Sequence, residues 1–231
     1  MTTTEISGPT PIVPGHVQRG GPTAVWRTPN AEVHKVSVSA MDNNAYLIVD
    51  LHTGDHLLID AADDAPRLQQ LLAAETATGS LVGILTTHRH PDHHGALVEL
   101  AAGTRAPVLA GADDADHLPA AVDHRLAHGD PVAVGSLGLQ VIALRGHTPG
   151  SVALVLADDG APPLVFTGDS LFPGGVGKTW SAADFEQLIT DVTERLFAAL
   201  PDETVLLPGH GDNTTLGTQR PHLPEWRARG W

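Results

Sequence analysis

The sequence of 231 residues contains no cysteine. No disulfide can therefore form, and the redox state of the compartment cannot be inferred from the sequence. The same absence restricts any metal site, because thiolate ligands are excluded. Each ligand must then be histidine, aspartate, glutamate or a backbone carbonyl.

Positive charge is scarce. The chain has 13 Lys and Arg residues against 27 Asp and Glu residues, which gives a formal net charge of −14. This balance argues against a nucleic-acid surface, which needs a basic stripe, and against binding to anionic membranes. No apolar stretch approaches the length of a membrane span, and the N-terminus lacks a secretion signal. We therefore expect a cytoplasmic protein that acts on a small molecule, with no nucleic acid or membrane partner and with its oligomeric state open.

Histidine, in contrast, is abundant, with 14 residues. Three of these lie with an aspartate in a His-x-His-x-Asp-His motif, made of His88, His90, Asp92 and His93. Imidazole and carboxylate groups so close together suit Zn, Fe, Mn or Ni. Side chains two apart in an extended segment point the same way, so His88 and His90 can share one ion. Pro91 suits the start of a helix, whose first turn would direct Asp92 and His93 towards a second ion.

Three further candidate ligands each follow an apolar segment, in a turn flanked by Gly or Pro. They are His147, Asp169 and His210, which follow the predicted strands Leu137–Leu144, Leu164–Thr167 and Thr204–Leu207. Functional residues collect on loops at the ends of sheet strands. We therefore expect these three side chains to meet the first motif, which follows the predicted strand Leu81–Thr86, at one edge of a sheet. His94 is expected to lie behind the ligands or in solvent.

The remaining pattern predicts one mixed α/β domain. Residues 1–23 are expected to form an extended arm, and residues 24–231 a single domain that includes a short C-terminal tail. The spacing of apolar residues predicts helices over Asp63–Thr78, Pro91–Ala102 and Ala182–Leu200. Residues 111–130 are expected to hold a short helix and loops. Further strands are predicted over Glu32–Ser39, Ala45–Asp50, His56–Asp60, Pro107–Ala110, Pro131–Val134 and Ser151–Ala157.

Four segments, HRHPDHHG, GHTPGS, FTGDSLF and LPGHG, occur in this order. They resemble the ordered motifs of the metallo-β-lactamase superfamily, and in particular its glyoxalase II-like (hydroxyacylglutathione hydrolase-like) hydrolases. The resemblance implies a four-layer αββα sandwich of two mixed sheets, with helices outside and a metal site at one edge. It also implies three ligand groups: His88, His90 and His147 for the first metal; Asp92, His93 and His210 for the second; and Asp169 as the bridge between them.

Such a site implies two divalent ions, zinc first, with iron and manganese as alternatives. Two ions about 3.5–4 Å apart would activate a bridging hydroxide for attack on a carbonyl group and stabilise the resulting oxyanion. Asp92 and Asp169 are the candidate catalytic residues, because either carboxylate can orient the attacking water and take its proton. The predicted function is a metal-dependent hydrolase that cleaves a thioester or a related ester.

Three alternatives remain open. One Fe(II) held by His88, His147 and Asp169 would give an enzyme similar to the persulfide dioxygenases. A lactonase would use the same pair of metals on a cyclic ester. A protein that binds metal without catalysis is the alternative outside the enzymes.

The loop after Asp169 supplies two candidate substrate contacts, Lys178 and Trp180. Lys178 would attract an anionic group of the substrate, and a solvated surface lysine is the alternative. Tyr46 is a third candidate, with ordinary sheet packing as the favoured interpretation. Only 21 residues follow His210, whereas the resemblance implies a longer helical part for binding glutathione. A glutathione thioester is therefore not the expected substrate, and a smaller acyl thiol, a different thiol conjugate of low molecular weight and a lactone remain open. Trp226 and Trp231 are expected to pack the tail.

Overall fold

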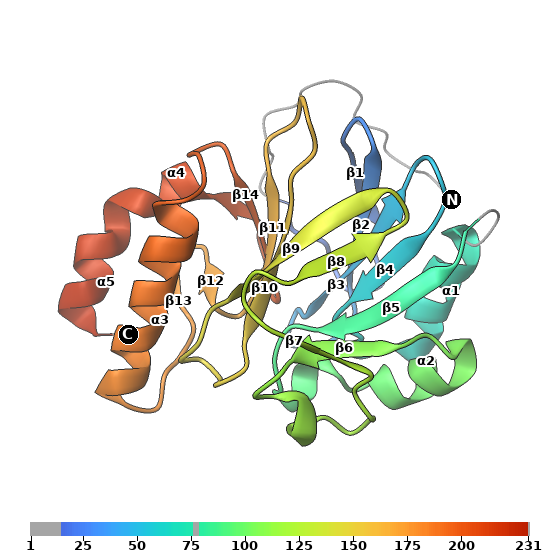
Figure 1. The fold of residues 1–231 in the computed structure, drawn as a ribbon, viewed down its shortest axis with the longest axis horizontal. Helices are drawn as coiled ribbons and strands as arrows, with labels where there is room; N and C mark the ends of the chain where they lie inside the picture. The colour runs from blue at the N-terminus through green and yellow to red at the C-terminus, as the bar shows by residue number, and fades with distance from the viewer. Residues whose placement is uncertain (1–14, 76–78, 231) are drawn as a thin grey trace.

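The alternation of apolar side chains along the strands explains the layers of the molecule (Figure 1). The structure, a computed structural model, describes residues 15–75 and 79–230. Successive side chains of a strand point to opposite faces of its sheet. In strand β3 (Asn44–Asp50), Tyr46 and Ile48 therefore enter the core between the two sheets, whereas Leu47 and Val49 enter a second core beneath helices.

The first sheet has seven strands in the order β1-β2-β3-β4-β5-β6-β7. Strands β1 to β4 pair antiparallel, and strands β4 to β7 pair parallel. The bounds of the six besides β3 are Ala24–Arg27 (β1), Ala31–Ser37 (β2), His56–Ile59 (β4), Leu81–Thr86 (β5), Val108–Gly111 (β6) and His124–Leu126 (β7).

The second sheet has six strands in the order β15-β14-β11-β10-β9-β8, and β11 and β14 are its parallel pair. A small hairpin, β12-β13, stands beside it. The bounds are Pro131–Val134 (β8), Leu137–Ala143 (β9), Val152–Leu156 (β10), Leu164–Gly168 (β11), Leu171–Phe172 (β12), Gly175–Val176 (β13), Val205–Pro208 (β14) and Thr214–Thr215 (β15).

Helices cover the outer face of each sheet, which confirms the predicted αββα sandwich (Figure 1). Helices α1 (Ala65–Glu75) and α2 (Leu97–Thr104) pack on the first sheet. The second sheet is covered by α3 (Ala182–Val192), a π-helical turn η3 (Thr193–Phe197), α4 (Leu216–Gln219), a 3-10 turn η4 (Arg220–His222) and α5 (Leu223–Arg229). Among the described residues, no helix has both the length and the apolar character needed to cross a bilayer.

Two features near the histidine motif differ from the prediction. The single helix expected over Pro91–Ala102 is divided into a 3-10 turn η1 (Pro91–His93) and α2. The division arises because the N–H groups of Gly95 and Ala96 donate to the carbonyls of Ala62 and Ala61, at 2.9 Å each, and not to the preceding turn. The helix also passes the expected stop at residue 103 and ends at Thr104, before a left-handed residue.

Other expectations have mixed outcomes. Residues 111–130 contain the expected short helix, η2 (Ala115–His117), but also the unpredicted strand β7. Strand β1 was not predicted either. Trp226 is buried on the second sheet, as expected of a packed tail. Residues 1–14 of the proposed arm, residues 76–78 of the first predicted helix and Trp231 lie outside the described residues.

Parallel pairing brings the carboxyl ends of many strands to a common edge. Strands β4, β5 and β6 run in the same direction, and so do β9, β11 and β14 in the other sheet. The loops that leave these ends carry the candidate ligands, and the amino end of β3 lies among them. The fold therefore places residues from distant parts of the sequence at one edge of the sandwich.

Candidate metal centre

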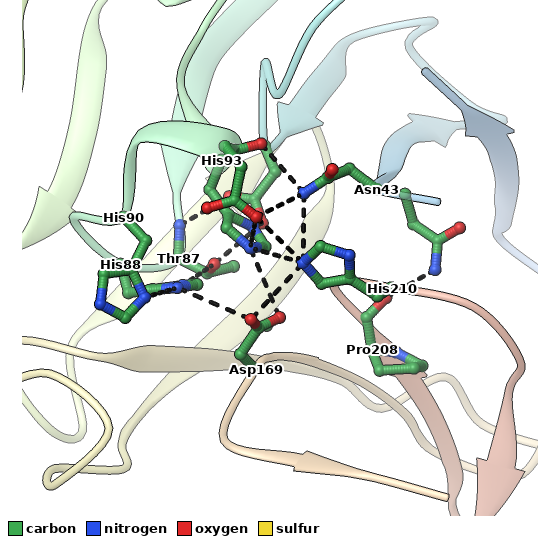
Figure 2. A network of polar contacts seen from close by, with 12 residues as sticks. Asn43, Thr87, His88, His90, His93, Asp169, Pro208 and His210 are labelled. Atoms are coloured by element: carbon green, nitrogen blue, oxygen red, sulfur yellow. Dashed lines mark hydrogen bonds and ion pairs between the residues drawn. The ribbon is translucent and has the colours of Figure 1, made fainter. Parts of the chain in front are cut away.

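The structure brings all seven predicted metal ligands together at this edge. Figure 2 shows that His88, His90, His93, Asp169 and His210 converge on a small space between the loops of the two sheets. The four residues of the first motif follow the end of β5, and His147, Asp169 and His210 follow β9, β11 and β14. Three groups of ligand atoms each lie within 4.8 Å of one another: His88, His90 and His147; Asp92, His93 and His210; His88, His93 and Asp169.

The first pocket consists of three imidazoles. His88 Nε2 lies 3.0 Å from His90 Nδ1. The ring centroid of His147 lies 4.8 Å from that of His88 and 4.6 Å from that of His90. His88 and His147 are buried, and His90 is half-buried. The three side chains of this pocket therefore offer a metal only nitrogen atoms as ligands.

The second pocket contains a carboxylate as well as imidazoles. His93 Nε2 and His210 Nε2 are 3.2 Å apart. Asp92 Oδ2 lies 3.5 Å from the first of these atoms and 3.2 Å from the second. Asp92 and His210 are partly exposed, so solvent reaches this side of the centre.

Asp169 lies between the two pockets. Its Oδ1 is 3.4 Å from His93 Nε2, while its Oδ2 is 3.5 Å from His210 Nε2. On the other side, Oδ2 lies 3.8 Å from His147 Nε2 and 4.0 Å from His88 Nε2. One carboxylate thus faces both sets of imidazoles, as a shared ligand would.

The outer nitrogens of four histidines have hydrogen-bond partners that fix the tautomer. Nδ1 of His147 and of His210 donates to the carbonyls of Lys178 and Met41, at 2.8 Å each. His93 Nδ1 donates to Asp60 Oδ2, also at 2.8 Å. His88 Nδ1 is 3.1 Å from Thr87 Oγ1, whose own proton is given to Asp60.

When the ring is neutral, each of these contacts directs an unprotonated Nε2 atom into the centre. A neutral imidazole that donates through Nδ1 presents a lone pair at Nε2, which is the form that binds metals. His147 Nε2 is buried and has no hydrogen-bond partner. A buried polar atom without a partner is costly, and a cation is the ligand that would satisfy it here. The donor set therefore fits divalent metal ions.

The charge states of the acidic groups and of the first pocket also suit a cation. Burial opposes ionisation of Asp169, but hydrogen bonding and charge from His93, with His88 and His210, hold the pKa of Asp169 well below its usual range. The pKa of Asp92 is lowered too, against burial, by Asn43 and His93. Burial lowers the pKa of His88 and of His90. The carboxylates are ionised and these imidazoles neutral at pH 7.

His93 differs from the other histidines. Burial would lower its pKa, but Asp60 on one side and Asp169 on the other raise the pKa of His93 to about 10. A proton on this ring therefore balances two carboxylates in the protein without metal. A divalent cation supplies the same compensation through the Nε2 side.

Two further polar residues support the centre, and Asp60 was not assigned to it from the sequence. Asp60 follows β4 and is 2% exposed, and it accepts hydrogen bonds from His93 and from the backbone N–H of Thr87. Its sequence signal was the same as that of Asp169, an aspartate directly after an apolar strand. Asn43 is fully buried, and its amide donates to Asp92 Oδ2 and to the Asp92 carbonyl, at 3.0 Å each.

The candidate substrate contacts divide into two kinds. Lys178 and Trp180 are exposed, and Lys178 Nζ lies 4.5 Å from the centroid of the Trp180 ring. Tyr46 does not fit a substrate contact in this structure. It is 2% exposed in the core between the sheets, and its hydroxyl donates to the Pro208 carbonyl at 2.7 Å. His94 lies behind the motif, with Nε2 3.1 Å from the Arg89 carbonyl.

The model of the metallo-beta-lactamase superfamily matches residues 39–210 of the chain. The chain is 39% identical over 170 residues to a hydroxyacylglutathione hydrolase of Fuscovulum blasticum, a match that covers 73% of this chain and 62% of that protein. The chain thus spans just under two thirds of the length of such curated relatives.

Solved structures agree with these matches. The structure of ETHE1 from Myxococcus xanthus is similar with a TM-score of 0.72 and 32% identity, and the match covers 83% of each chain. A structure of TTHA1623 in a di-iron-bound form is similar with a TM-score of 0.64 and 32% identity, over 80% of this chain and 96% of that one.

Proposed function

The chain belongs to the metallo-beta-lactamase superfamily, and from its centre we propose that it is a dinuclear metal-dependent hydrolase that cleaves a thioester or a related ester. One observation carries this proposal: Asp169 lies between two pockets whose buried histidines direct Nε2 lone pairs at a common space. Such an arrangement suits two cations that share one carboxylate.

The residues that would hold the metals follow from the two pockets. His88, His90 and His147 would bind the first ion, Asp92, His93 and His210 the second, and Asp169 both. Zinc is the proposed metal, with iron or manganese as alternatives, since all three accept imidazole and carboxylate ligands. When bound, the ions would supply an activated water and a Lewis acid for the carbonyl oxygen.

The protein's own carboxylates would manage the proton. Asp92 is 26% exposed and Asp169 is 19% exposed, so both reach the space that a substrate carbonyl must enter. Both are ionised at neutral pH because their pKa values are lowered. Asn43 fixes Asp92 Oδ2, which orients this carboxylate to accept a hydrogen bond from water and to pass the proton on.

Recognition of the substrate would fall to the loop after β13. The carbonyl of Lys178 accepts the hydrogen bond of His147, while its side chain is exposed beside Trp180. The backbone of this loop therefore contacts the first pocket, and the same loop carries an exposed ammonium group and an exposed aromatic face, which suit an anionic thiol conjugate. The relative from Fuscovulum blasticum is named for a glutathione thioester, and glutathione conjugates belong in the substrate screen.

Lys178→Ala tests this assignment. We expect KM for an anionic thioester to rise about threefold to fivefold with kcat unchanged, since an exposed charge contributes up to about 1 kcal/mol. Lys178→Arg serves as the control, because it keeps the charge. An unchanged KM in Lys178→Ala would remove Lys178 from the substrate site.

The similarity to the ETHE1 structure favours a second candidate function, a mononuclear iron dioxygenase that acts on persulfides. Two histidines and one carboxylate are the ligands of such iron sites, and His88, His147 and Asp169 supply them. A lactonase is a further candidate that uses the same centre as the thioesterase.

Metal content decides between the dinuclear hydrolases and the dioxygenase. The protein is purified without chelator, its metals are counted by elemental mass spectrometry, and thioesters, lactones and persulfides are assayed in parallel. Two ions per chain with thioester hydrolysis are expected, and His210→Gln should lose one ion while the exposed control His222→Gln keeps both. One iron per chain with oxygen uptake would select the dioxygenase. Failure to bind zinc, iron or manganese when supplied would overturn both.

A further inference from the structure

A buried carboxylate that the proposed mechanism does not use stands behind the first pocket. Asp114 follows β6, at the same edge as the ligands, and its side chain is 0% exposed. It belongs to the polar segment that the sequence analysis assigned only to a short helix and loops. A fully buried carboxylate is costly unless its oxygens are satisfied, so its partners show what it is for.

Each oxygen of Asp114 accepts hydrogen bonds from a ligand-bearing loop. Oδ2 accepts from the backbone N–H of Arg89, at 3.0 Å, and from Thr148 Oγ1, at 2.5 Å. Oδ1 accepts from the backbone N–H of Gly150, at 3.0 Å, and lies 3.7 Å from Arg89 Nε. Every donor therefore belongs to one of two loops.

These two loops carry all three ligands of the first pocket. Arg89 stands between His88 and His90, and the peptide groups on both sides of it are held. Asp114 accepts the N–H of Arg89, and His94 approaches its carbonyl. Thr148 directly follows His147. Asp114 thus connects a loop of the first sheet to a loop of the second sheet at the point where the three imidazoles meet.

The junction around Asp114 is also closely packed. A Cβ added to Gly150 would lie 2.3 Å from Asp114 N, and one added to Gly111 would lie 1.9 Å from the Gly150 carbonyl oxygen. The loop that carries His147 therefore lies against the end of β6 with no room for even one added methyl group. The hydrogen bonds of Asp114 and this close packing together fix the separation of the loops.

The second pocket has a different support. Asp60 contacts its ligand directly, because it accepts the hydrogen bond of His93 Nδ1. None of the described hydrogen-bond partners of Asp114 is a ligand side chain. Asp114 instead holds two backbone N–H groups and the Thr148 hydroxyl of the ligand loops. We propose that Asp114 is the positioning residue of the first metal pocket, which sets the distance of His147 from His88 and His90. This inference rests on the metal centre of the proposed function.

Asp114→Asn is the test. The side chain keeps its volume, but one acceptor oxygen becomes an NH₂ group, which repels the N–H or O–H group that donated to that oxygen. Thr148→Val removes one of the donors with little change in shape. Asp123→Asn is the matched control: Asp123 Oδ2 accepts from Val108 N at 2.8 Å, at the start of the same strand, away from the ligand loops.

The measurement is stepwise binding of cobalt(II) and zinc to each protein after removal of metal. Wild type is expected to bind two ions in two steps. Asp114→Asn should lose affinity in one step by about 10- to 100-fold and change the cobalt absorption of that site, whereas the other step stays within about twofold. Thr148→Val should show a smaller loss in the same step, and Asp123→Asn none.

Thermal unfolding of the metal-free proteins separates positioning from simple stability. A lower Tm of metal-free Asp114→Asn with both binding steps unchanged would overturn the inference, and so would an equal loss in both steps. Wild type that binds no metal would instead overturn the proposed function. If Asp114→Asn does not fold, Thr148→Val carries the test alone, with the same expected and opposing results.

Discussion

The two ends of strand β3 lie in opposite environments. At its amino end, Asn43 and Asn44 join the candidate metal centre, where Asp169 faces imidazole nitrogens at 3.4 to 4.0 Å. At its carboxyl end, the carboxylate of Asp50 is fully buried and accepts hydrogen bonds from His52 N, Thr53 Oγ1 and Ser136 N. Ser136 belongs to the turn between β8 and β9, so Asp50 connects the two sheets at the edge away from the metals.

The comparison separates two uses of a buried carboxylate. The carboxylate of Asp50 accepts hydrogen bonds from N–H and O–H groups of the protein, so its ionised form stabilises the fold without a bound cation. Asp169 faces imidazole rings from both pockets, and the proton of His93 balances its charge in the protein without metal. A divalent cation would take the place of that proton. Substitutions at the metal edge should therefore reduce activity and metal binding, while those at the opposite edge should reduce stability.

Asp169→Asn should have the largest effect. Loss of the shared carboxylate should lower kcat/KM on the order of 10³-fold, because the charge that both cations face is removed. The Tm of the metal-free protein should fall less than that of Asp50→Asn, because Asp60 remains to balance the proton of His93. Steady-state kinetics and thermal unfolding after chelation measure both. A metal-free Tm that falls further than that of Asp50→Asn would contradict the comparison.

Asp60→Asn should have the next largest effect. An amide has one acceptor oxygen, so it cannot accept all the hydrogen bonds that Asp60 accepts from His93 Nδ1 and from Thr87. The imidazole of His93 then loses its fixed tautomer. Metal affinity of the second pocket should fall about 10- to 100-fold. Competition with a chelator of known affinity measures the change. Unchanged affinity in both pockets would show that the backbone alone orients His93.

A pair of glycine substitutions compares the edges directly. A Cβ at Gly209 would lie 2.5 Å from Asp169 Oδ1 and from His93 Cε1, whereas one at Gly138, near the start of β9, meets nothing within 4 Å. Gly209→Ala should reduce activity at least about tenfold through displaced ligands, and Gly138→Ala should change stability by less than about 0.5 kcal/mol. Equal activity of the two variants would contradict the close packing described at the centre.

Asp50→Asn should change stability and not catalysis. Burial would raise the pKa of Asp50, but the hydrogen bonds from Ser136, His52 and Thr53 win and lower this pKa to about 2. Because the folded pKa is below the ordinary 3.8, the carboxylate stabilises the fold above pH 3.8 and loses that effect as pH falls towards 2.

Denaturant unfolding at several pH values checks this expectation. At pH 7 the variant should be less stable by about 1–3 kcal/mol, the cost of a lost partner for a buried group. The difference from wild type should shrink steadily below pH 4. A difference that stays constant down to pH 2 would mean that the charge of Asp50 is not what stabilises this edge, and lower kcat would contradict its distance from the centre.

The sequence predicted the architecture and the convergence of the ligands well. The family, the sandwich and most strands are confirmed, because alternating apolar residues and glycine-flanked strand ends leave strong patterns. The division of the helix after Pro91 was missed, since it depends on carbonyls of Ala61 and Ala62 that are distant in sequence. Asp60 and Asp114 were missed for a different reason. Aspartate is common in ordinary turns, so an aspartate after a strand does not by itself indicate a functional site.

The parallel pairing of β14 with β11 sets the order in which the centre is completed during synthesis. A ribosome adds about 5–20 residues per second from the N-terminus, and long-range pairing waits for both strands. The first-motif ligands emerge early, but His210 comes only after β14. The first pocket, whose three histidines all precede β14, can therefore form before the second pocket, which waits for His210.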